Sequence, residues 1–348
     1  SARATLETAM ARSVDAGQKY GSAGAVVATY LAELLYETDE LDACETLVVD
    51  YLPIVVETGL PDHLIVLHRT AARLHGLRGR PRAAQEVIAE LGELGERRGL
   101  DRLVAAAWLE RVHVALRGAD RDAAGRALAL GADPVLAQRL GAVQPYAGEV
   151  EDALIAQLRV QLVFGPTDPA LPRVQAARQD AEATGRRRRA VRLRFLESQI
   201  LERLGRQREA SAAFEAALTW AARGGLVRTL ADDAWAVDTL CRRAAGSTDP
   251  AIAALVERLR SVGGADAGLS DASANPAAEA ARPRPFHLTT RELQILRLLW
   301  KGHSNKALAR DLFLSENTIE THLRRIYEKL GTRNRTQAAA LAREAGAI

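Results

Sequence analysis

The sequence predicts an all-α protein in which a helical solenoid and a compact four-helix domain are joined by a flexible linker. Three observations support this fold class. A two-helix unit recurs about every 40 residues up to position 262. Residues 263–285 are rich in Gly, Ala, Ser, Asp and Pro and show no apolar periodicity. Residues 286–348 then contain four helical patterns with recognisable start signals.

The first region repeats a helix, a tight turn, a second helix and a terminating glycine. Each turn contains a small residue that is followed five positions later by alanine, as in Thr38…Ala43, Gly79…Ala84, Gly118…Ala123, Gly165…Ala170 and Gly205…Ala210. The terminating glycines are Gly59, Gly99, Gly141, Gly185 and Gly225. Such a period indicates stacked hairpins that bury their apolar faces against their neighbours. The pattern resembles a tetratricopeptide repeat, with a period nearer to about 40 residues than to roughly 34.

Two parts of this array depart from the regular unit. In the unit around Gly118–Gly141, Gly131 and Pro134 are expected to interrupt the second helix. A last pair, at roughly Val227–Ala245 and Pro250–Val262, has no repeat after it and is expected to cap the array. Residues 1–262 are therefore predicted to form one sensor or interaction domain, followed by a linker at 263–285.

Charge and composition narrow the function. Residues 286–348 carry a net charge of +5, which leaves −2 on residues 1–285 and favours a nucleic-acid partner for the last domain. No apolar run approaches the roughly 18 residues of a membrane span, and no signal peptide precedes the array. Cys44 and Cys241 lie in apolar helical patterns, so we expect buried free thiols and a cytoplasmic location, without a membrane partner. The absence of an initiator Met before Ser1 favours a fragment.

The last domain divides into four helices. Helix one starts at a capping box formed by Thr289 and Glu292, and its apolar face is expected to hold Leu293, Leu296, Leu299 and Trp300. Ser304, Ser315 and Asn334 are predicted to begin the other three helices. In helix three, helical spacing places one set of residues on a buried stripe, namely Ile319, Leu323, Ile326 and Leu330. The opposite face is polar and basic, and a short helix, a turn and such a second helix fit a major groove.

These residues resemble the LuxR-type helix-turn-helix family. Its motif is met by Leu288, Thr289, Arg291, Glu292, Leu296, Gly302, Ser304, Asn305, Lys306, Leu308, Ala309, Leu312, Leu314, Ser315, Thr318, Ile319, His322, Leu323, Ile326, Tyr327, Lys329 and Leu330. The resemblance implies a bacterial transcription regulator that binds double-stranded DNA, with helix three in the major groove. It also implies a homodimer on DNA, paired through the fourth helix at Ala338, Leu341 and Ala342.

The resemblance also implies roles for individual residues. The base-reading positions fall on Glu320, Thr321 and Arg324. The phosphate-contacting positions fall on Ser304, Asn305, Lys306, Thr318, His322, Arg325 and Lys329. For Thr318, His322, Lys329 and Arg324, a structural or solvated role is the alternative. The family commonly has Lys at the position of Glu320, and an acid there should weaken non-specific attraction to DNA.

A helical array joined to such a domain resembles the carboxy-terminal part of large ATP-binding regulators of the maltose-regulon activator type. No P-loop motif occurs in the sequence, so no cofactor is expected in these residues, and ATP is expected only if an NTPase module precedes Ser1. No zinc-protease, nucleophile-elbow or Cys/His metal motif occurs, and the protein is predicted not to be an enzyme.

The favoured function is transcription regulation, with activation as the expected sign, in which the solenoid senses a small effector or a protein partner. The alternative is a protein-docking scaffold that the last domain tethers to DNA. The arginines at 186–189, 192 and 194 are a candidate anion patch, although a solvated run is the favoured interpretation. Trp108, Trp220 and Trp235 are candidate pocket residues, but we expect them in the core.

Overall fold

The computed structural model describes residues 2–17, 21–140, 151–233, 237–244, 247, 249–272, 295–296, 298–300, 303–311, 319–320, 323–324, 326–327, 330, 332, 334–335, 337–338 and 341. All regular secondary structure in these ranges is helical. The predicted all-α class is therefore confirmed.

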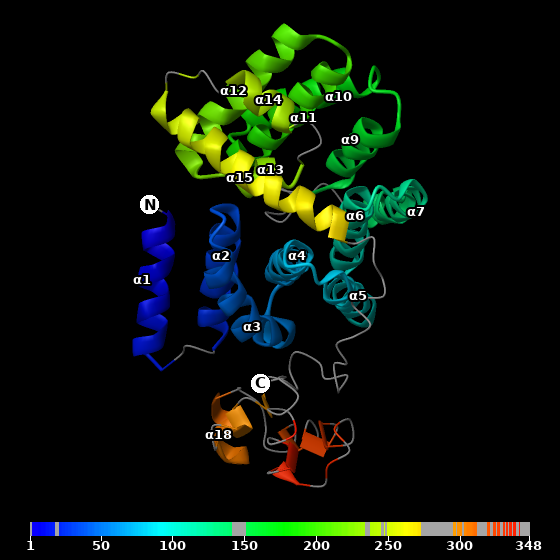
Figure 1. Ribbon diagram of the computed structural model, residues 1–348. Helices are drawn as coiled ribbons and strands as arrows, with labels where there is room; N and C mark the ends of the chain where they lie inside the picture. Colours follow the sequence, from blue (N-terminus) through cyan, green and yellow to red (C-terminus); the bar gives the residue numbers. More distant parts are fainter. Residues whose placement is uncertain are drawn as a thin grey trace. The chain divides into compact units, whose positions relative to one another are not determined.

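The first region is a series of helical hairpins (Figure 1). Its helices are α1 (Ala2–Asp15), α2 (Ser22–Glu37), α3 (Leu41–Thr58), α4 (Pro61–Leu77), α5 (Pro81–Arg98), α6 (Asp101–Arg117), α7 (Arg121–Gly131), α8 (Pro134–Leu140), α9 (Ala153–Phe164), α10 (Ala170–Ala183), α11 (Arg187–Arg203) and α12 (Gln207–Gly224). Three further helices follow, the short helices α13 (Arg228–Ala231) and α14 (Val237–Ala244) and the long helix α15 (Pro250–Ala272). The predicted breaks of the third unit at Gly131 and Pro134 coincide with the end of α7 and the start of α8.

The hairpin turns share one backbone geometry. A residue with positive φ follows the first helix in four of them: Asp39 (62°), Gly79 (67°), Ala119 (52°) and Gly205 (74°). The next amide then donates back over the helix end, as Arg80 N does to His75 O at 2.9 Å. In two turns the left-handed residue is therefore not the small residue of the sequence pattern but the one after it. The turn at Gly165 differs, because that glycine has an extended backbone.

The predicted end of the array is partly wrong. The helix expected over Val227–Ala245 is interrupted, because α13 already ends at Ala231 and the buried residues Asp232 and Asp233 lie in a turn; α14 is a separate helix. The second helix of the pair, α15, does not stop near Val262 but continues to Ala272. It thus runs into the range predicted as linker, where alanines and a leucine support a helix despite Gly263 and Gly264.

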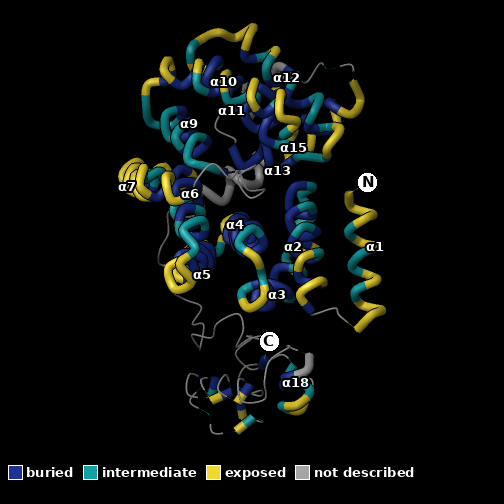
Figure 2. Tube along the Cα trace, turned by 180° about the vertical axis from the view of Figure 1, so that it is seen from behind, coloured by how far each residue is buried: buried dark blue, intermediate teal, exposed yellow. Residues whose placement is uncertain are grey.

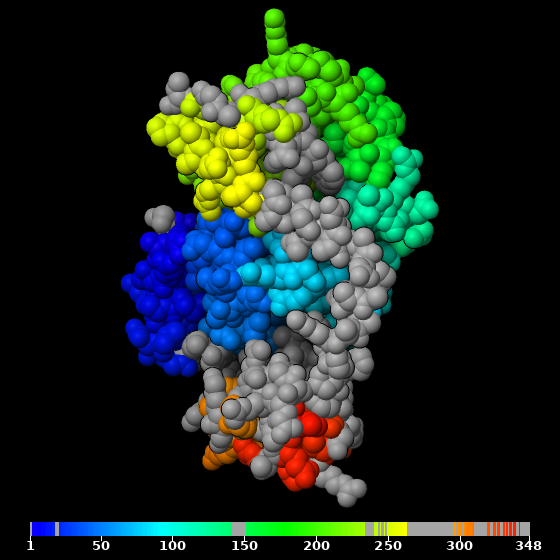
Figure 3. Space-filling model, viewed as in Figure 1, coloured from blue at the N-terminus to red at the C-terminus, as the bar shows by residue number. Residues whose placement is uncertain are grey.

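The described chain separates into two compact units. One consists of residues 33–44 and 64–273, and the other of residues 1–32, 45–63 and 274–348. In the first of these units, α9 to α15 share one apolar core that includes Phe195, Phe214 and Leu259. The tube in Figure 2 shows α11 and α13 mostly buried, whereas α1, in the other unit, is largely exposed. The side chains of α12 and α15 adjoin in Figure 3, in keeping with direct contact between these helices.

The first and last parts of the array are joined within the unit of residues 33–44 and 64–273. The amide of Val227 donates to the carbonyl of Glu37 at 2.9 Å. Arg228 pairs with Asp39 at 2.6 Å, and Arg258 donates to the carbonyl of Thr38 at 2.5 Å. The end of α2 and its turn are therefore tied to α13 and α15, so this array is closed rather than open-ended.

Candidate nucleic-acid interface

The last domain has an apolar core of its own. The stripe predicted for helix three, Ile319, Leu323, Ile326 and Leu330, is buried there. It packs with residues of the first, second and fourth helices, namely Ile295, Leu296, Leu299, Leu308, Ala309 and Ala338. The sequence therefore predicted the buried stripe of helix three correctly at all four positions.

Two predicted helix starts are confirmed by their caps. Ser304 Oγ accepts a hydrogen bond from the amide of Ala307 at 3.2 Å, directly before α18 (Asn305–Asp311). Asn334 Oδ1 accepts from the amide of Gln337 at 2.9 Å, which begins the fourth helix. Arg335 donates to the carbonyl of His303 at 2.6 Å and so links these two helix starts. The caps at Thr289 and Ser315 lie outside the described residues.

The placement of Trp300 differs from the prediction. Its neighbours Leu296 and Leu299 are buried, but Trp300 is 48% exposed. Ile295, Leu296 and Leu299 set the direction of the buried stripe, and Trp300 falls at the edge of that stripe by helical periodicity.

The exposed side of helix three carries two of the predicted base-reading residues. Glu320 and Arg324 are exposed, whereas Ile319 and Leu323, which precede each of them in the chain, are buried. A spacing of four residues puts both polar side chains on one face of the helix. A carboxylate can accept from the amino group of cytosine, and a guanidinium can donate two hydrogen bonds to guanine. Thr321 lies outside the described residues.

The predicted phosphate contacts are described at the start of α18. Ser304 and Lys306 are exposed and Asn305 is half-buried, so these positions place a hydroxyl, an amide and an ammonium within one turn. Groups of this kind bind phosphate oxygens and fix the register of a protein on DNA. The other predicted contacts, Thr318, His322, Arg325 and Lys329, lie outside the described residues.

The residues predicted to pair two domains have different environments. Ala338 is fully buried in the core of its own domain, so its side chain is not at the surface. Leu341 is half-buried and packs against the same core. Ala342 lies outside the described residues. A pairing surface on this helix would therefore not include the Ala338 side chain.

The domain matches a known family of DNA-binding regulators. Residues 287–342 match the family described as bacterial regulatory proteins, luxR family. The "Probable csgAB operon transcriptional regulatory protein" of Salmonella typhimurium is 49% identical over 57 residues, and so is the "CsgBAC operon transcriptional regulatory protein" of Escherichia coli. The "HTH-type transcriptional regulator MalT" of Serratia proteamaculans is 41% identical over 61 residues. The carboxy-terminal domain is therefore a LuxR-type helix-turn-helix domain.

The similarity covers a limited part of each chain. The matched residues are 16% of this chain and 26% of each of the two csg regulators. For the MalT protein they are 18% of this chain and 7% of the relative. No solved structure matches the chain.

The arginine run at 186–194 is not the solvated run that the sequence favoured. Arg188 pairs with Glu33 at 2.8 Å and with Glu37, and Arg189 pairs with Asp152 at 2.6 Å. Arg192 is fully buried. It pairs with Asp233 at 2.7 Å. These arginines form part of a network of ion pairs inside the solenoid, so they are not a free anion patch either.

The centre of this network was missed by the sequence analysis. Three buried guanidinium groups, those of Arg73 in α4, Arg159 in α9 and Arg192 in α11, form what we call the arginine cradle. Asp232 and Asp233, the aspartate pair, follow α13 and supply carboxylates to it. Burial acts to raise the pKa of Asp233, but Arg159 and Arg192 outweigh it and hold the pKa below its usual value. Two adjacent aspartates between apolar segments were the signal available in the sequence.

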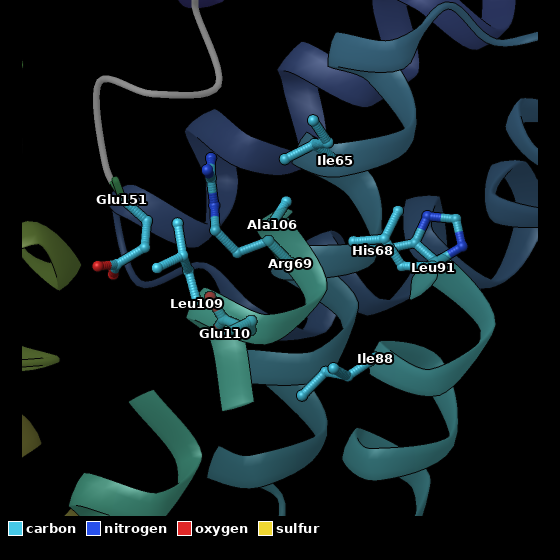
Figure 4. Close-up of a pocket in the computed structure, with 9 residues that line it drawn as sticks. All are labelled: Ile65, His68, Arg69, Ile88, Leu91, Ala106, Leu109, Glu110 and Glu151. Atoms are coloured by element: carbon cyan, nitrogen blue, oxygen red, sulfur yellow. The ribbon is translucent and has the colours of Figure 1, made fainter. Parts of the chain in front are cut away.

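A cavity adjoins this network in the same unit. Figure 4 shows its lining, which comes from α4, α5, α6 and the residue two positions before α9: Ile65, His68, Arg69, Ile88, Leu91, Ala106, Leu109, Glu110 and Glu151. His68 Nδ1 donates to the carbonyl of Leu64 at 2.7 Å. Burial lowers the pKa of His68 to about 4, so its ring is neutral near pH 7. The cavity therefore has apolar walls and a few polar groups.

The other candidate groups are structural. Trp108 and Trp220 are half-buried and pack against apolar cores, as expected, and Arg111 and Arg194 lie over their rings. Trp235 lies outside the described residues. Cys44 and Cys241 are buried and form no disulfide. Among the residues that the structure describes, none of the helices is long and apolar enough to cross a membrane, and no cluster of His, Cys, Asp or Glu has the makings of a metal site.

Proposed function

We propose that this protein is a transcription regulator, an activator, that binds promoter DNA through its LuxR-type domain. The observation that carries the proposal is that Glu320 and Arg324 both lie on the exposed face of a helix whose opposite face is buried. A helix of this kind can enter a major groove, while residues at the start of α18 contact the phosphate backbone of the DNA. The regulators it resembles are named for the control of operons or transcription.

We propose further that the solenoid senses a small effector rather than docking a protein. A docking solenoid offers its inner surface to the partner. Here inward residues of α2, α4, α9 and α11, such as Glu33, Arg69 and Arg159, are buried and paired within the unit. This arrangement favours a ligand small enough to enter the interior. Co-purification of a stoichiometric protein partner would instead support the scaffold alternative.

The test of DNA binding compares Arg324→Ala with Lys306→Ala in the full chain. Arg324→Ala should weaken binding by about 1–3 kcal/mol and relax discrimination at one base pair. Lys306→Ala should weaken all sequences alike and flatten the slope of log K against log salt by about one ion. The measurement is a fluorescence anisotropy titration on a selected site, its single-base variants and random duplex, each at several salt concentrations. Equal losses on all sequences for both variants would refute base reading by Arg324.

A further inference from the structure

The arginine cradle has to be neutralised by carboxylates. Arg73 is 6% exposed, Arg159 is 1% exposed and Arg192 is 0% exposed. Taking three guanidinium groups out of water is costly unless anions with suitable geometry replace the solvent. Because the three arginines come from α4, α9 and α11, they surround one region of the interior of this unit.

The aspartate pair fills that region from a single short segment. Asp232 accepts from Arg73 at 3.3 Å and from the hydroxyl of Tyr36 at 3.0 Å. Asp233 accepts from Arg159 Nη2 at 3.0 Å and from Arg192 Nη1 at 2.7 Å. The segment begins with α13, a helix of only four residues without a side-chain cap. Two carboxylates on one small piece of chain therefore bind as a dicarboxylic acid would.

The cradle offers more hydrogen-bond donors than the aspartate pair uses. Among the described residues, Nε and Nη2 of Arg192 have no hydrogen-bond partner, although this side chain is fully buried. The neighbouring His113 is also buried, and its Nδ1 atom has no hydrogen-bond partner in this part of the structure. Burial and then Arg73 and Arg159 lower the pKa of His113 well below its usual value. The His113 ring beside the cradle is therefore neutral near pH 7. Buried polar groups without protein partners are rare, and a bound water, ion or ligand can satisfy them.

A small cavity, with a volume of about 20 Å³, also lies next to the cradle. Glu110 and Glu151 line the cavity of Figure 4, and both pair with Arg73, at 2.7 and 3.4 Å. The carboxylate oxygen Oε1 of Glu151 has no hydrogen-bond partner among the described residues. The ion-pair network is therefore bordered by a cavity and not enclosed entirely by packed side chains.

We propose that Arg73, Arg159 and Arg192 form a binding site for a small dicarboxylate, which the chain's own Asp232 and Asp233 occupy in the absence of that ligand. Binding of the dicarboxylate displaces the aspartate pair and releases the segment that carries it. This inference rests on the proposed sensing function and assigns its ligand class. No covalent step is involved, because one pair of carboxylates replaces another on the same donors.

The experiment is isothermal titration calorimetry on the full chain without DNA. The ligands are succinate, glutarate and adipate, and the controls are their neutral diamides at equal ionic strength. At least one dicarboxylate should bind with a stoichiometry near one, while its diamide gives no saturable heat. Arg192→Gln should abolish this binding. Arg178→Gln, which removes an arginine that pairs with Glu182 and Glu197 elsewhere in the unit, should leave it unchanged.

A mild variant tests competition by the aspartate pair. Tyr36→Phe removes one hydrogen bond from Asp232 and keeps all three arginines, so dicarboxylate affinity should rise about fivefold. The double variant Asp232→Asn, Asp233→Asn should melt at a lower temperature and be rescued by the dicarboxylate but not by the diamide. If that double variant does not fold, the comparison of Tyr36→Phe with the parent decides.

The proposal is overturned if dicarboxylates and diamides give the same heats in the parent and in Tyr36→Phe. It is also overturned if dicarboxylate binding survives Arg192→Gln. Neither result affects DNA binding, which is measured separately by anisotropy. Conversely, dicarboxylate binding without any effect on DNA affinity would retain the site and contradict effector sensing.

Discussion

At the scale of single residues, the proposed base-reading role of Glu320 predicts that the charge at this position affects non-specific DNA binding. Glu320 is exposed on the same helix face as Arg324. A carboxylate there is repelled by phosphates but can accept a hydrogen bond from cytosine. If this face contacts DNA as proposed, the acid should lower non-specific affinity and raise selectivity.

The variant Glu320→Lys should reverse this balance. Affinity for random duplex should rise, and the slope of log K against log salt should steepen by about one to two ions, because a phosphate contact is added and a repulsion is lost. The selected site should gain less than random duplex does, so the specificity ratio should fall. Anisotropy titrations across a salt series measure both quantities, and Glu320→Gln serves as the neutral control. An unchanged slope would place Glu320 away from the DNA.

At the scale of elements, the packing of α5 on α6 depends on a glycine. A Cβ at Gly95 would lie 2.8 Å from Val104 Cγ2 and 2.9 Å from both Leu103 Cβ and Val104 N. At Gly92, one turn earlier on α5, the nearest atom would be Ala107 Cβ at an ordinary 3.5 Å. The two glycines therefore differ in packing although both lie within the same helix.

The variant Gly95→Ala should lower the free energy of unfolding by about 1–3 kcal/mol, since the two helices must move apart. Gly92→Ala is the matched control and should be neutral or stabilising by up to about 1 kcal/mol, because alanine favours the helix. Urea denaturation followed by circular dichroism measures both. Equal effects of the two substitutions would show that close approach at Gly95 is not required.

The hairpin turns allow a second comparison. Ala119 has a φ of 52°, and Gly205 has a φ of 74° at the equivalent position of another hairpin turn. A Cβ at Gly205 would meet nothing within 4 Å. Ala119→Gly should therefore stabilise the chain by about 0.5–1 kcal/mol, and Gly205→Ala should destabilise it by about 1 kcal/mol through the backbone alone. Thermal and urea unfolding measure both values. Destabilisation by Ala119→Gly would contradict this account.

At the scale of the whole molecule, the DNA-binding domain should function alone. Its apolar core, from Ile295 to Ala338, consists of its own residues. A fragment of residues 286–348 should therefore fold and shift duplex DNA in a gel at low salt. Its affinity for a single DNA site should lie within about tenfold of the affinity of the full chain for the same site. Ile326→Asp, which places a charge in that core, is the unfolded control. A folded fragment that fails to bind would refute autonomy.

The sequence predicted local features better than long-range ones. Hairpin positions, the buried stripe of helix three and the caps at Ser304 and Asn334 follow from periodicity and from side chains a few residues apart. The partner of Arg192 lies 41 positions away at Asp233, and no local pattern relates them. The same contact helps to explain the break after α13, which periodicity predicted as continuous helix.

The contacts that join the two ends of the array also limit how it can evolve. They connect Glu37, Thr38 and Asp39 with Val227, Arg228 and Arg258. An open solenoid can gain or lose a unit by gene duplication or deletion, because each unit touches only its neighbours. A closed array lacks that freedom, since one extra hairpin would separate the joined ends. Homologues of this protein should therefore vary in loop length and surface charge but keep the same number of hairpins between α2 and α13.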